Sequence, residues 1–321
     1  EEERARRRPK YNDSLEDDEI DVQIMDEETE QAETRRAFRR YVTVQNDNYA
    51  ATEDFAPYLT EIEYINNLSC KFAAIVDTVK NNPGNAFVYG EYVEGSGAIV
   101  LGLCFEGMGF ERYNETTSMF IGNDVDTVKP YCGSSGNGRR QINPNFKKKV
   151  RYALLTRKTS DAKFQSMMEL FNSYENRHGE YIKVLIASRV GRDGINVNNG
   201  MQAHLVGSEW NQSAMYQALS RIFRATGHED LLEEERQRLI AAGGDPADAR
   251  ITVDVYRHAA VSDEGQSVDV EMYLLSEFKH RAISRIMRIL KQCSIGCQTH
   301  YNRNVRDSDV DYSADCDYDL C

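Results

Sequence analysis

The stretch NQSAMYQALSRIFRATGH, residues 211–228, combines basic and apolar side chains in one predicted helix. At about 100° per residue, Gln217, Arg221 and Arg224 project from one face of that helix. The opposite face carries apolar side chains that we expect to pack on a core: Met215, Leu219, Ile222 and Phe223. Two arginines on one polar face suit an anion such as a triphosphate, and the alternative is a solvated helix face.

Residues around this helix predict its limits and its neighbours. Asn211 is a plausible N-cap and Gly227 a plausible stop. Short apolar runs predict strands at 86–89, 150–155, 181–187, 203–207 and 251–257. Helical spacing predicts helices at 97–108, 160–172, 211–228, 230–242 and 268–291. This alternation predicts an α/β fold, a three-layer parallel sheet with helices on both faces.

Charge is unevenly distributed along the 321 residues, which have a net charge of −13. Residues 1–34 hold 14 acidic and 5 basic residues and are predicted to be a disordered acidic tail. We expect a linker at 35–57, a globular domain at 58–260, a helical extension at 261–304 and an acidic, cysteine-containing tail at 305–321. The start of the linker, RRAFRRYVTVQND (35–47), could also be a short helix that runs into a strand. The middle of the chain, 35–300, is neutral, so a local basic groove remains compatible with the acidic total.

Cysteine usage and hydropathy bear on the compartment. The seven cysteines have an odd count and scattered spacing, which favours a reducing, intracellular compartment over a secreted disulfide framework. The pairs Cys293/Cys297 and Cys316/Cys321 are compatible with a zinc site as an alternative, although their spacing departs from the commonest pattern. No long uncharged apolar run is present, so we expect no membrane partner.

Polar residues follow the predicted strands where parallel sheets bind ligands. Thr156 and Arg157 follow the strand at 150–155, and Ser188 follows the strand at 181–187, just before the loop Gly191–Gly194. Ligands of open parallel sheets lie beyond the C-terminal strand ends. These residues are therefore candidates for a binding site.

Two long stretches resemble a known family. YIKVLIASRVGRDGIN (181–196) and AHLVGSEWNQSAMYQALSRIFRATGHEDL (203–231) look like motifs V and VI of the second RecA-like domain of superfamily 2 helicases. Three further stretches extend the likeness: FVYGEYVEGSGAIVLGLCFEGMGF (87–110), YALLTRKTSDAKFQSMMELFNSYENRHGEYIKVLI (152–186) and RILKQCSIGCQTHYNRN (288–304). The resemblance covers roughly 58–304 and is nearest to helicase-like ATPases of large DNA viruses, including the poxvirus-type early transcription factor small subunit and its nucleoside-triphosphatase relatives. It implies a RecA-like sheet.

The resemblance assigns roles to the predicted helix. Gln217, Arg221 and Arg224 match the family pattern Q-x-x-x-R-x-x-R. In the family both arginines face the ATP γ-phosphate across a cleft between two RecA-like domains, which makes Arg224 the expected arginine finger and Arg221 its neighbour. A guanidinium there stabilises the charge that develops on the transferring phosphoryl group. Gln217 and His228 are expected to orient the site.

The resemblance also assigns roles at the strand ends. Ser188 matches the hydroxyl residue that binds a nucleic-acid phosphate, and Gly194 matches a glycine where the backbone approaches its ligand closely. Asn196 stands where the family often has an aspartate on the ATP ribose, so it keeps an acceptor and loses the charge. Thr156 and Arg157 resemble strand-end residues that touch the nucleic-acid backbone, with a plain surface arginine as the alternative.

No G-x-x-x-x-G-K-[ST] phosphate loop occurs in the 321 residues. We therefore expect ATP and Mg²⁺ to be bound mainly by a missing first RecA-like domain, supplied in the same chain or by a separate polypeptide. The expected function is the C-terminal motor domain of a viral, transcription-linked helicase or translocase, in the host cytoplasm or virion. Expected partners are nucleic acid, with DNA favoured, the N-terminal RecA-like domain and RNA polymerase. The alternatives are a non-catalytic nucleic-acid or polymerase-binding subunit and a gene fragment without an independent role.

Overall fold

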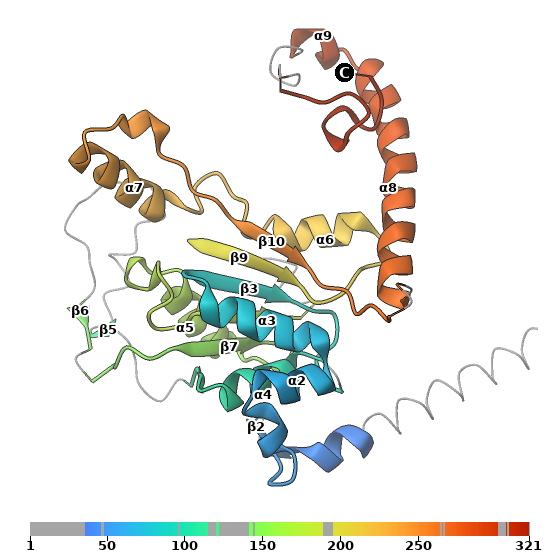
Figure 1. The fold of residues 1–321 in the computed structure, drawn as a ribbon. Helices are drawn as coiled ribbons and strands as arrows, with labels where there is room; N and C mark the ends of the chain where they lie inside the picture. Colours follow the sequence, from blue (N-terminus) through green and yellow to red (C-terminus); the bar gives the residue numbers. More distant parts are fainter. Residues whose placement is uncertain are drawn as a thin grey trace, which may run out of the picture.

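A parallel β-sheet forms the centre of the protein (Figure 1). The computed structural model describes residues 36–45, 48–95, 97–114, 120–121, 141–143, 145–188, 195–263, 265, 267–300, 306 and 308–320. The six strands lie in the order β10-β9-β3-β8-β7-β4, and every neighbouring pair is parallel. Their bounds are β3 Asn85–Tyr89, β4 Glu111–Arg112, β7 Arg151–Leu155, β8 Val184–Ala187, β9 Gly200–Leu205 and β10 Asp254–Arg257.

Helices cover both faces of this sheet, because alternate side chains of its central strands enter two separate apolar cores. Ala86 and Val88 of β3 belong to the core shared with α2 (Ile62–Leu68), α3 (Cys70–Asn81) and α4 (Ala98–Gly107). Phe87 and Tyr89 belong to the core shared with α5 (Asp161–Phe171) and α6 (Gln212–Leu219). The predicted three-layer α/β fold is thus confirmed.

Local sequence explains where these helices begin. Ser69 separates α2 from α3, and its side chain accepts a hydrogen bond from the Phe72 amide. Ser160 caps α5 through the Lys163 amide, as predicted. The continuous apolar strand runs become the fully buried β3 and β8, as strands covered on both faces require.

The chain segments that follow the neighbouring central strands β3 and β8 pack on opposite faces of the sheet. β3 is followed by α4 on one face, whereas residues 195–197, which follow β8, pack in the core of the other face. The strand order therefore switches between β3 and β8, where the Gly90 amide donates to the Ala187 carbonyl at 3.1 Å. In open parallel sheets a ligand crevice lies at such a switch point.

Residues 36–55 differ from the expected linker. They form a helix at 36–41 and the antiparallel hairpin of β1 (Val42–Gln45) and β2 (Asn48–Ala51), followed by η2 (Ala56–Leu59). Phe38, Val42 and Tyr49 are buried in the same core as α3 and α4. Apolar residues of this segment thus pack on the sheet domain, which sequence spacing alone left ambiguous.

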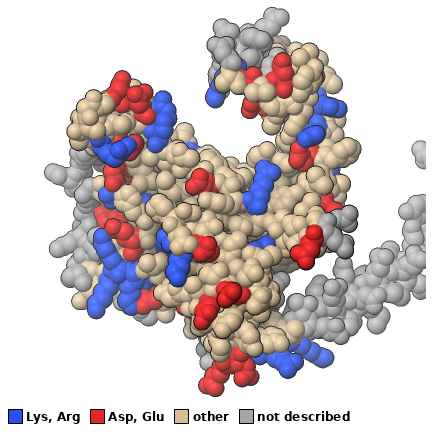
Figure 2. All heavy atoms as spheres, in the orientation of Figure 1, with Lys and Arg blue, Asp and Glu red and all other residues tan. Residues whose placement is uncertain are grey.

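Two helical arms rise beyond the sheet, and the surface is hollowed between them (Figures 1 and 2). One arm is α7 (Glu229–Ala241), and the other is the 25-residue α8 (Val268–Gln292) with α9 (Gly296–Thr299). Short elements complete the described chain: β5 Phe120–Ile121, β6 Gln141–Ile142, η4 Tyr174–Asn176, η6 Pro246–Asp248 and η7 Ala314–Cys316. None of the helices in the described ranges could cross a membrane.

The predicted N-terminal tail, residues 1–34, lies outside the described residues. Most of the predicted C-terminal tail, 305–321, is described, at residues 306 and 308–320, and it contains the short helix η7. Cys316 is disulfide-bonded, whereas Cys70, Cys104, Cys293 and Cys297 are free thiols. The expectation of a reducing compartment therefore stays a prediction.

Candidate functional site

Thr156 and Ser188 lie next to each other at the C-terminal ends of β7 and β8. Leu155 and Ala187 are paired in the sheet, and the Ser188 amide donates to the Leu155 carbonyl at 3.2 Å. Both predicted hydroxyl residues are almost fully buried, with Thr156 7% and Ser188 2% exposed. Thr156 and Ser188 are thus neighbours at the predicted end of the sheet, and the adjacent Arg157 is exposed to solvent.

Thr156 opens a tight turn that leads into α5. Its amide donates to Thr159 Oγ1 at 3.0 Å, and its own Oγ1 accepts from the Lys158 amide at 3.2 Å. Side-chain hydrogen bonds to nearby backbone are the usual way in which Ser and Thr hold such turns. This turn fixes Arg157 and Lys158 at the edge of the sheet, beside the N-terminal end of α5.

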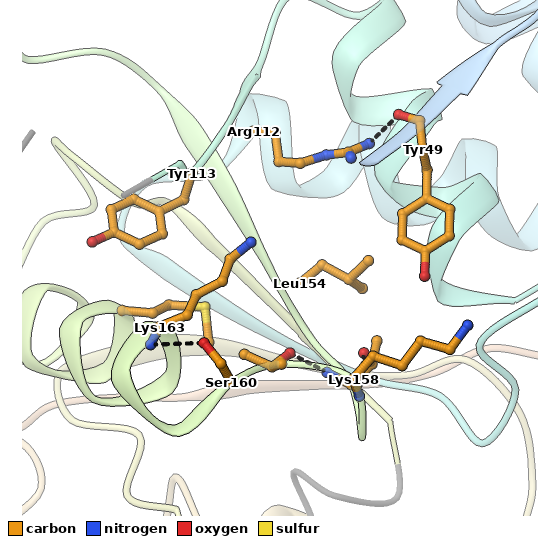
Figure 3. Close-up of a pocket in the computed structure, with 10 residues that line it drawn as sticks. Tyr49, Arg112, Tyr113, Leu154, Lys158, Ser160 and Lys163 are labelled. Carbon is orange, nitrogen blue, oxygen red and sulfur yellow. Dashed lines mark hydrogen bonds between the residues drawn. The ribbon is translucent and has the colours of Figure 1, made fainter. Parts of the chain in front are cut away.

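A pocket of about 120 Å³ opens beside this turn (Figure 3). Three cations contribute to its wall, Arg112, Lys158 and Lys163, and the Lys163 ammonium points into it in Figure 3. The other lining residues are Tyr49, Tyr113, Leu154, Thr156, Thr159, Ser160 and Met167. The pocket thus joins hydroxyl groups to positive charge at a helix N-terminus, a combination that suits an anion.

Arg112 holds one wall of the pocket in place. Its guanidinium donates to the Tyr49 carbonyl at 2.8 Å and to Tyr152 Oη at 2.8 Å, and it pairs with Glu106 at 2.9 Å. Burial works to lower the pKa of Arg112, but Tyr152 and Glu106 raise it overall. Lys158 pairs with Glu94 at 3.2 Å, so the charge of this lysine is also partly balanced.

The helix that carries the predicted arginine pair is shorter than expected. α6 ends at Leu219, so Arg221 and Arg224 lie outside it and the predicted single helical face with Gln217 is wrong. The cause is tertiary hydrogen bonding: the Arg221 carbonyl accepts from the Val197 amide at 3.0 Å, and the Gly227 carbonyl accepts from the Asn199 amide at 2.7 Å. We call residues 220–228 the arginine strap, because it is tied at both ends to residues 197–199.

Burial along this stretch follows the expected pattern with one exception. Met215, Leu219 and Ile222 are buried as predicted. Phe223 is 51% exposed, because the chain has left the helix before it reaches that position. Asn211 stands at the N-cap position of α6, although its side chain makes no capping hydrogen bond.

The predicted residues on and beside the arginine strap each have different surroundings. Arg224 donates to the Ile195 carbonyl at 3.3 Å and remains exposed, while Gln217 is exposed on α6. His228 Nε2 lies 2.7 Å from the Gly200 carbonyl, so it carries the hydrogen and fixes the start of β9. Asn196 is held through its own carbonyl, which accepts from Asn172 Nδ2 at 2.9 Å.

The loop that connects the two groups of residues is only partly described. Gly194, the loop Gly191–Gly194 and Arg189 lie outside the described residues. Ser188 and Ile195 are the described residues on either side. The strand-end hydroxyls and the arginine strap are therefore joined by one short stretch of chain.

Sequence reasoning missed other residues at this edge. Lys158 and Lys163 follow Thr156 closely, and the basic residues of TRKTSDAK were a readable signal for them. Tyr89 donates to the buried carboxylate of Glu209 at 2.9 Å, which ties the end of β3 to the segment before α6. Tyr49 and Arg112 had no sequence signal, because the hairpin that brings Tyr49 to the pocket was not predicted.

Within the described ranges, no group of three or more His, Cys, Asp or Glu residues could hold a metal ion. The chain's own described residues thus do not assemble a Mg²⁺ site, and no step is assigned to a metal at this edge.

The helicase conserved C-terminal domain matches residues 135–226, which contain the Thr156 turn, Ser188 and most of the arginine strap. A putative helicase of Invertebrate iridescent virus 3 is 26% identical over 261 residues, which are 79% of this chain and 23% of the relative. One of Frog virus 3 is 28% identical over 256 residues, 79% of this chain and 22% of the relative. A termination factor NPH-I homolog of African swine fever virus is 26% identical over 181 residues, 54% of this chain and 25% of the relative.

Among solved structures, the C-terminal part of the Fun30 ATPase domain is similar at a TM-score of 0.35 and 12% identity. That likeness covers 73% of this chain and 48% of the other, and at this TM-score the fold rests on the strand order above. The expected relationship to helicases of large DNA viruses is confirmed. The chain spans about a quarter, or less, of the length of the curated relatives named above.

Proposed function

We propose that this chain, whose residues 135–226 match the helicase conserved C-terminal domain, is the second motor domain of a superfamily 2 ATP-dependent helicase or translocase used in viral transcription. The observation that carries the proposal is the arginine strap, which holds Arg221 and Arg224 of the Q-x-x-x-R-x-x-R pattern beside the chain that leads from Ser188. The names of the relatives, helicases and termination factor homologs, agree with it.

Arg224 is proposed as the arginine finger and Arg221 as its neighbour. A guanidinium pointing at a γ-phosphate stabilises negative charge without accepting a proton. The backbone hydrogen bonds from residues 197 and 199 hold the strap in position, so little reordering is needed when a phosphate arrives. Asn196, Gly194, Gln217 and His228 are proposed to orient the nucleotide from the same side.

The strand-end turn is proposed as the grip on nucleic acid. Thr156 and Ser188 stand side by side, and Arg157 and Lys158 add exposed charge at the same edge. Because the two hydroxyls are buried, we assign the first contact with a phosphate to Arg157 and Lys158. Charged side chains fix such contacts without reading the base sequence. DNA is proposed as the favoured partner on the resemblance to helicase-like ATPases of large DNA viruses.

ATP and Mg²⁺ would be bound mainly by a first RecA-like domain with a phosphate loop, which the 321 residues do not contain. Closure of the two domains would bring the arginine strap onto the γ-phosphate while the strand-end turn holds one strand. Alternation between closed and open states then moves the grip along the nucleic acid. RNA polymerase is proposed as a further partner, in the host cytoplasm or virion and in a reducing compartment.

The first test measures ATP hydrolysis. We expect no ATPase activity above background for the chain alone, and activity when it is joined to a phosphate-loop domain in one polypeptide or in a complex. Arg224→Ala should then lower the turnover rate by roughly 10³-fold or more. Arg238→Ala on α7, which removes an arginine paired with nearby Glu235, is the matched control and should leave turnover unchanged.

Robust hydrolysis by the chain alone would contradict the missing-domain assignment. Unchanged turnover with Arg224→Ala in the joined protein would favour the second candidate, a non-catalytic nucleic-acid or polymerase-binding subunit. The observation that favours this candidate is the absence of a phosphate loop from the 321 residues.

The second test measures binding of a fluorescent single-stranded DNA by the chain alone. Arg157→Ala and Lys158→Ala should each weaken binding several-fold and reduce the slope of log affinity against log salt by about one. Lys80→Ala is the control, because this exposed lysine lies at the end of α3, which leads into the N-terminal end of β3, whereas Arg157 and Lys158 follow the C-terminal end of β7. Equal losses for Lys80→Ala and Arg157→Ala would contradict a grip located at the strand-end turn.

A further inference from the structure

The outer face of α8 is apolar and exposed over most of its length. Phe278 at 71% and Leu274 at 63% are among its most exposed side chains. At about 100° per residue, six apolar positions between residues 274 and 289 fall within roughly 120° of arc. These positions are Leu274, Leu275, Phe278, Ala282, Ile286 and Ile289. A soluble helix does not normally present such a stripe to water, so the face is expected to be covered.

The inner face of α8 is already occupied by this chain. Ser276 and Ser284 are buried, and Asp269 pairs with Lys71 of α3 at 2.8 Å. His280 contacts the rings of Tyr216 on α6 and Tyr318 near the C-terminus. The outer stripe is therefore a separate surface, and α8 extends past the sheet to carry it (Figure 1).

Two charged residues lie within the apolar stripe, one on each side of its central residue, Phe278. Glu271 and Arg285 fall in the same arc, about 21 Å apart along the helix at 1.5 Å per residue. Neither side chain forms an ion pair within the part of the chain that the structure describes. Lys279 lies toward the border of the stripe, where its ammonium sits 4.8 Å over the Trp210 ring.

We propose that the outer face of α8 pairs antiparallel with the same face of a second copy of this chain. In a symmetric pair the residue order reverses, so a two-fold axis near Phe278 sets Glu271 of one copy within about one turn of Arg285 of the other, and Arg285 opposite Glu271 in return. The apolar residues between them then meet their counterparts. The pairing is independent of the proposed catalytic role.

The positions of Glu271 and Arg285 favour a second copy of this chain over other partners for the outer face of α8. A purely apolar partner would bury Glu271 and Arg285 without partners, which is costly. A uniformly acidic partner would satisfy Arg285 but would place like charge against Glu271. An antiparallel copy satisfies both residues at once and leaves the apolar centre continuous.

The first experiment measures the mass of the 321-residue chain in solution by sedimentation equilibrium between about 1 and 100 μM. We expect a concentration-dependent dimer. Phe278→Glu places one carboxylate from each copy at the centre of the dimer interface. This substitution should weaken dimerisation at least 100-fold. Tyr58→Glu is the control, since Tyr58 is 54% exposed on η2, away from α8, and should leave the dimer unchanged.

Charge reversal tests the register. Glu271→Arg and Arg285→Glu should each weaken the dimer about tenfold or more, and the double variant should restore it. Because Glu271 lies in the first turn of α8, the single variant also affects the helix end, and recovery in the double variant separates pairing from that local effect. A monomer at 100 μM, an intact dimer in Phe278→Glu, or no recovery in the double variant would each overturn the proposal.

Discussion

At the scale of single residues, the position of the two strap arginines depends on a close contact that involves a glycine. A Cβ atom on Gly200 would lie 2.5 Å from Ile222 Cδ1 and 2.7 Å from its Cγ1. Ile222 is fully buried and sits between Arg221 and Arg224 in the chain. The absence of a side chain at residue 200 therefore lets the strap pack against the start of β9.

We accordingly expect Gly200→Ala to lower the free energy of unfolding by about 1–3 kcal/mol, because a buried side chain must move to make room. Urea denaturation of the chain measures the change. Gly207→Ala is the matched control, since its added methyl group meets nothing within 4 Å. Equal stability of the two variants would show that the strap yields without cost.

Some of these residue positions were readable in the sequence and others were not. The cap Ser160 was predicted, because a hydroxyl before an apolar periodic run acts through its own helix alone. The orientation of Arg221 and Arg224 was not, because the end of α6 is set by amides of residues 197 and 199. Local patterns predict local hydrogen bonds, and the strap is held by distant ones.

At the scale of elements, a chain of hydrogen bonds runs from the residue after β10 through β9 to the turn before β3, and it includes two histidines. His258 Nε2 lies 3.0 Å from His204 Nδ1, His204 Nε2 lies 3.3 Å from Gln202 Oε1, and Gln202 donates to the Pro83 carbonyl at 3.0 Å. With both rings neutral, His258 donates to His204 and His204 donates to Gln202. Burial lowers the pKa of His204 to about 3, helped by His258, and lowers that of His258 to about 4, helped by Lys71.

These depressed pKa values predict acid sensitivity. The unfolded chain takes up protons at both histidines below its usual pKa near 6.5, while the folded chain does not until about pH 4, so stability is lost as pH falls. We expect the free energy of unfolding to drop by roughly 2–3 kcal/mol between pH 7 and pH 5 from this pair. His204→Gln should flatten that dependence in urea titrations, and an unchanged slope would contradict the assignment.

The regular elements of the sheet were the most predictable part of the fold. β3, β7 and β8 are short apolar runs whose two-sided burial leaves a clear signal. The hairpin of β1 and β2 gave no such signal, because only alternate residues such as Val42 and Tyr49 enter the core. The pocket wall that Tyr49 forms with Arg112 was therefore hidden in the sequence.

At the scale of the whole molecule, the folded unit begins earlier than composition suggests. Residues 36–55, expected to be a linker, place Phe38 in the core under α3 and α4. Arg112 reaches back across the sheet edge to the Tyr49 carbonyl and so attaches the hairpin to β4. The segment and the sheet domain should thus unfold together.

Phe38→Ala tests this boundary. Removal of a 7%-exposed phenylalanine should cost about 3 kcal/mol of unfolding free energy and leave a single cooperative transition. Tyr58→Ala, on an exposed side chain, should cost less than about 0.5 kcal/mol. A second, earlier transition in either thermal or urea unfolding would show that residues 36–55 form a separate unit.

The tied ends of the arginine strap have a mechanical consequence for the proposed motor. The covalent chain from Ser188 runs through Ile195 to Val197 and Asn199, whose amides hold the strap. Force from a nucleic acid held at the strand-end turn beside Ser188, and movement of Arg224 against a phosphate, would thus be transmitted along one stretch of backbone. Nucleic-acid binding and ATP hydrolysis would then be mechanically coupled through a connecting segment of about a dozen residues.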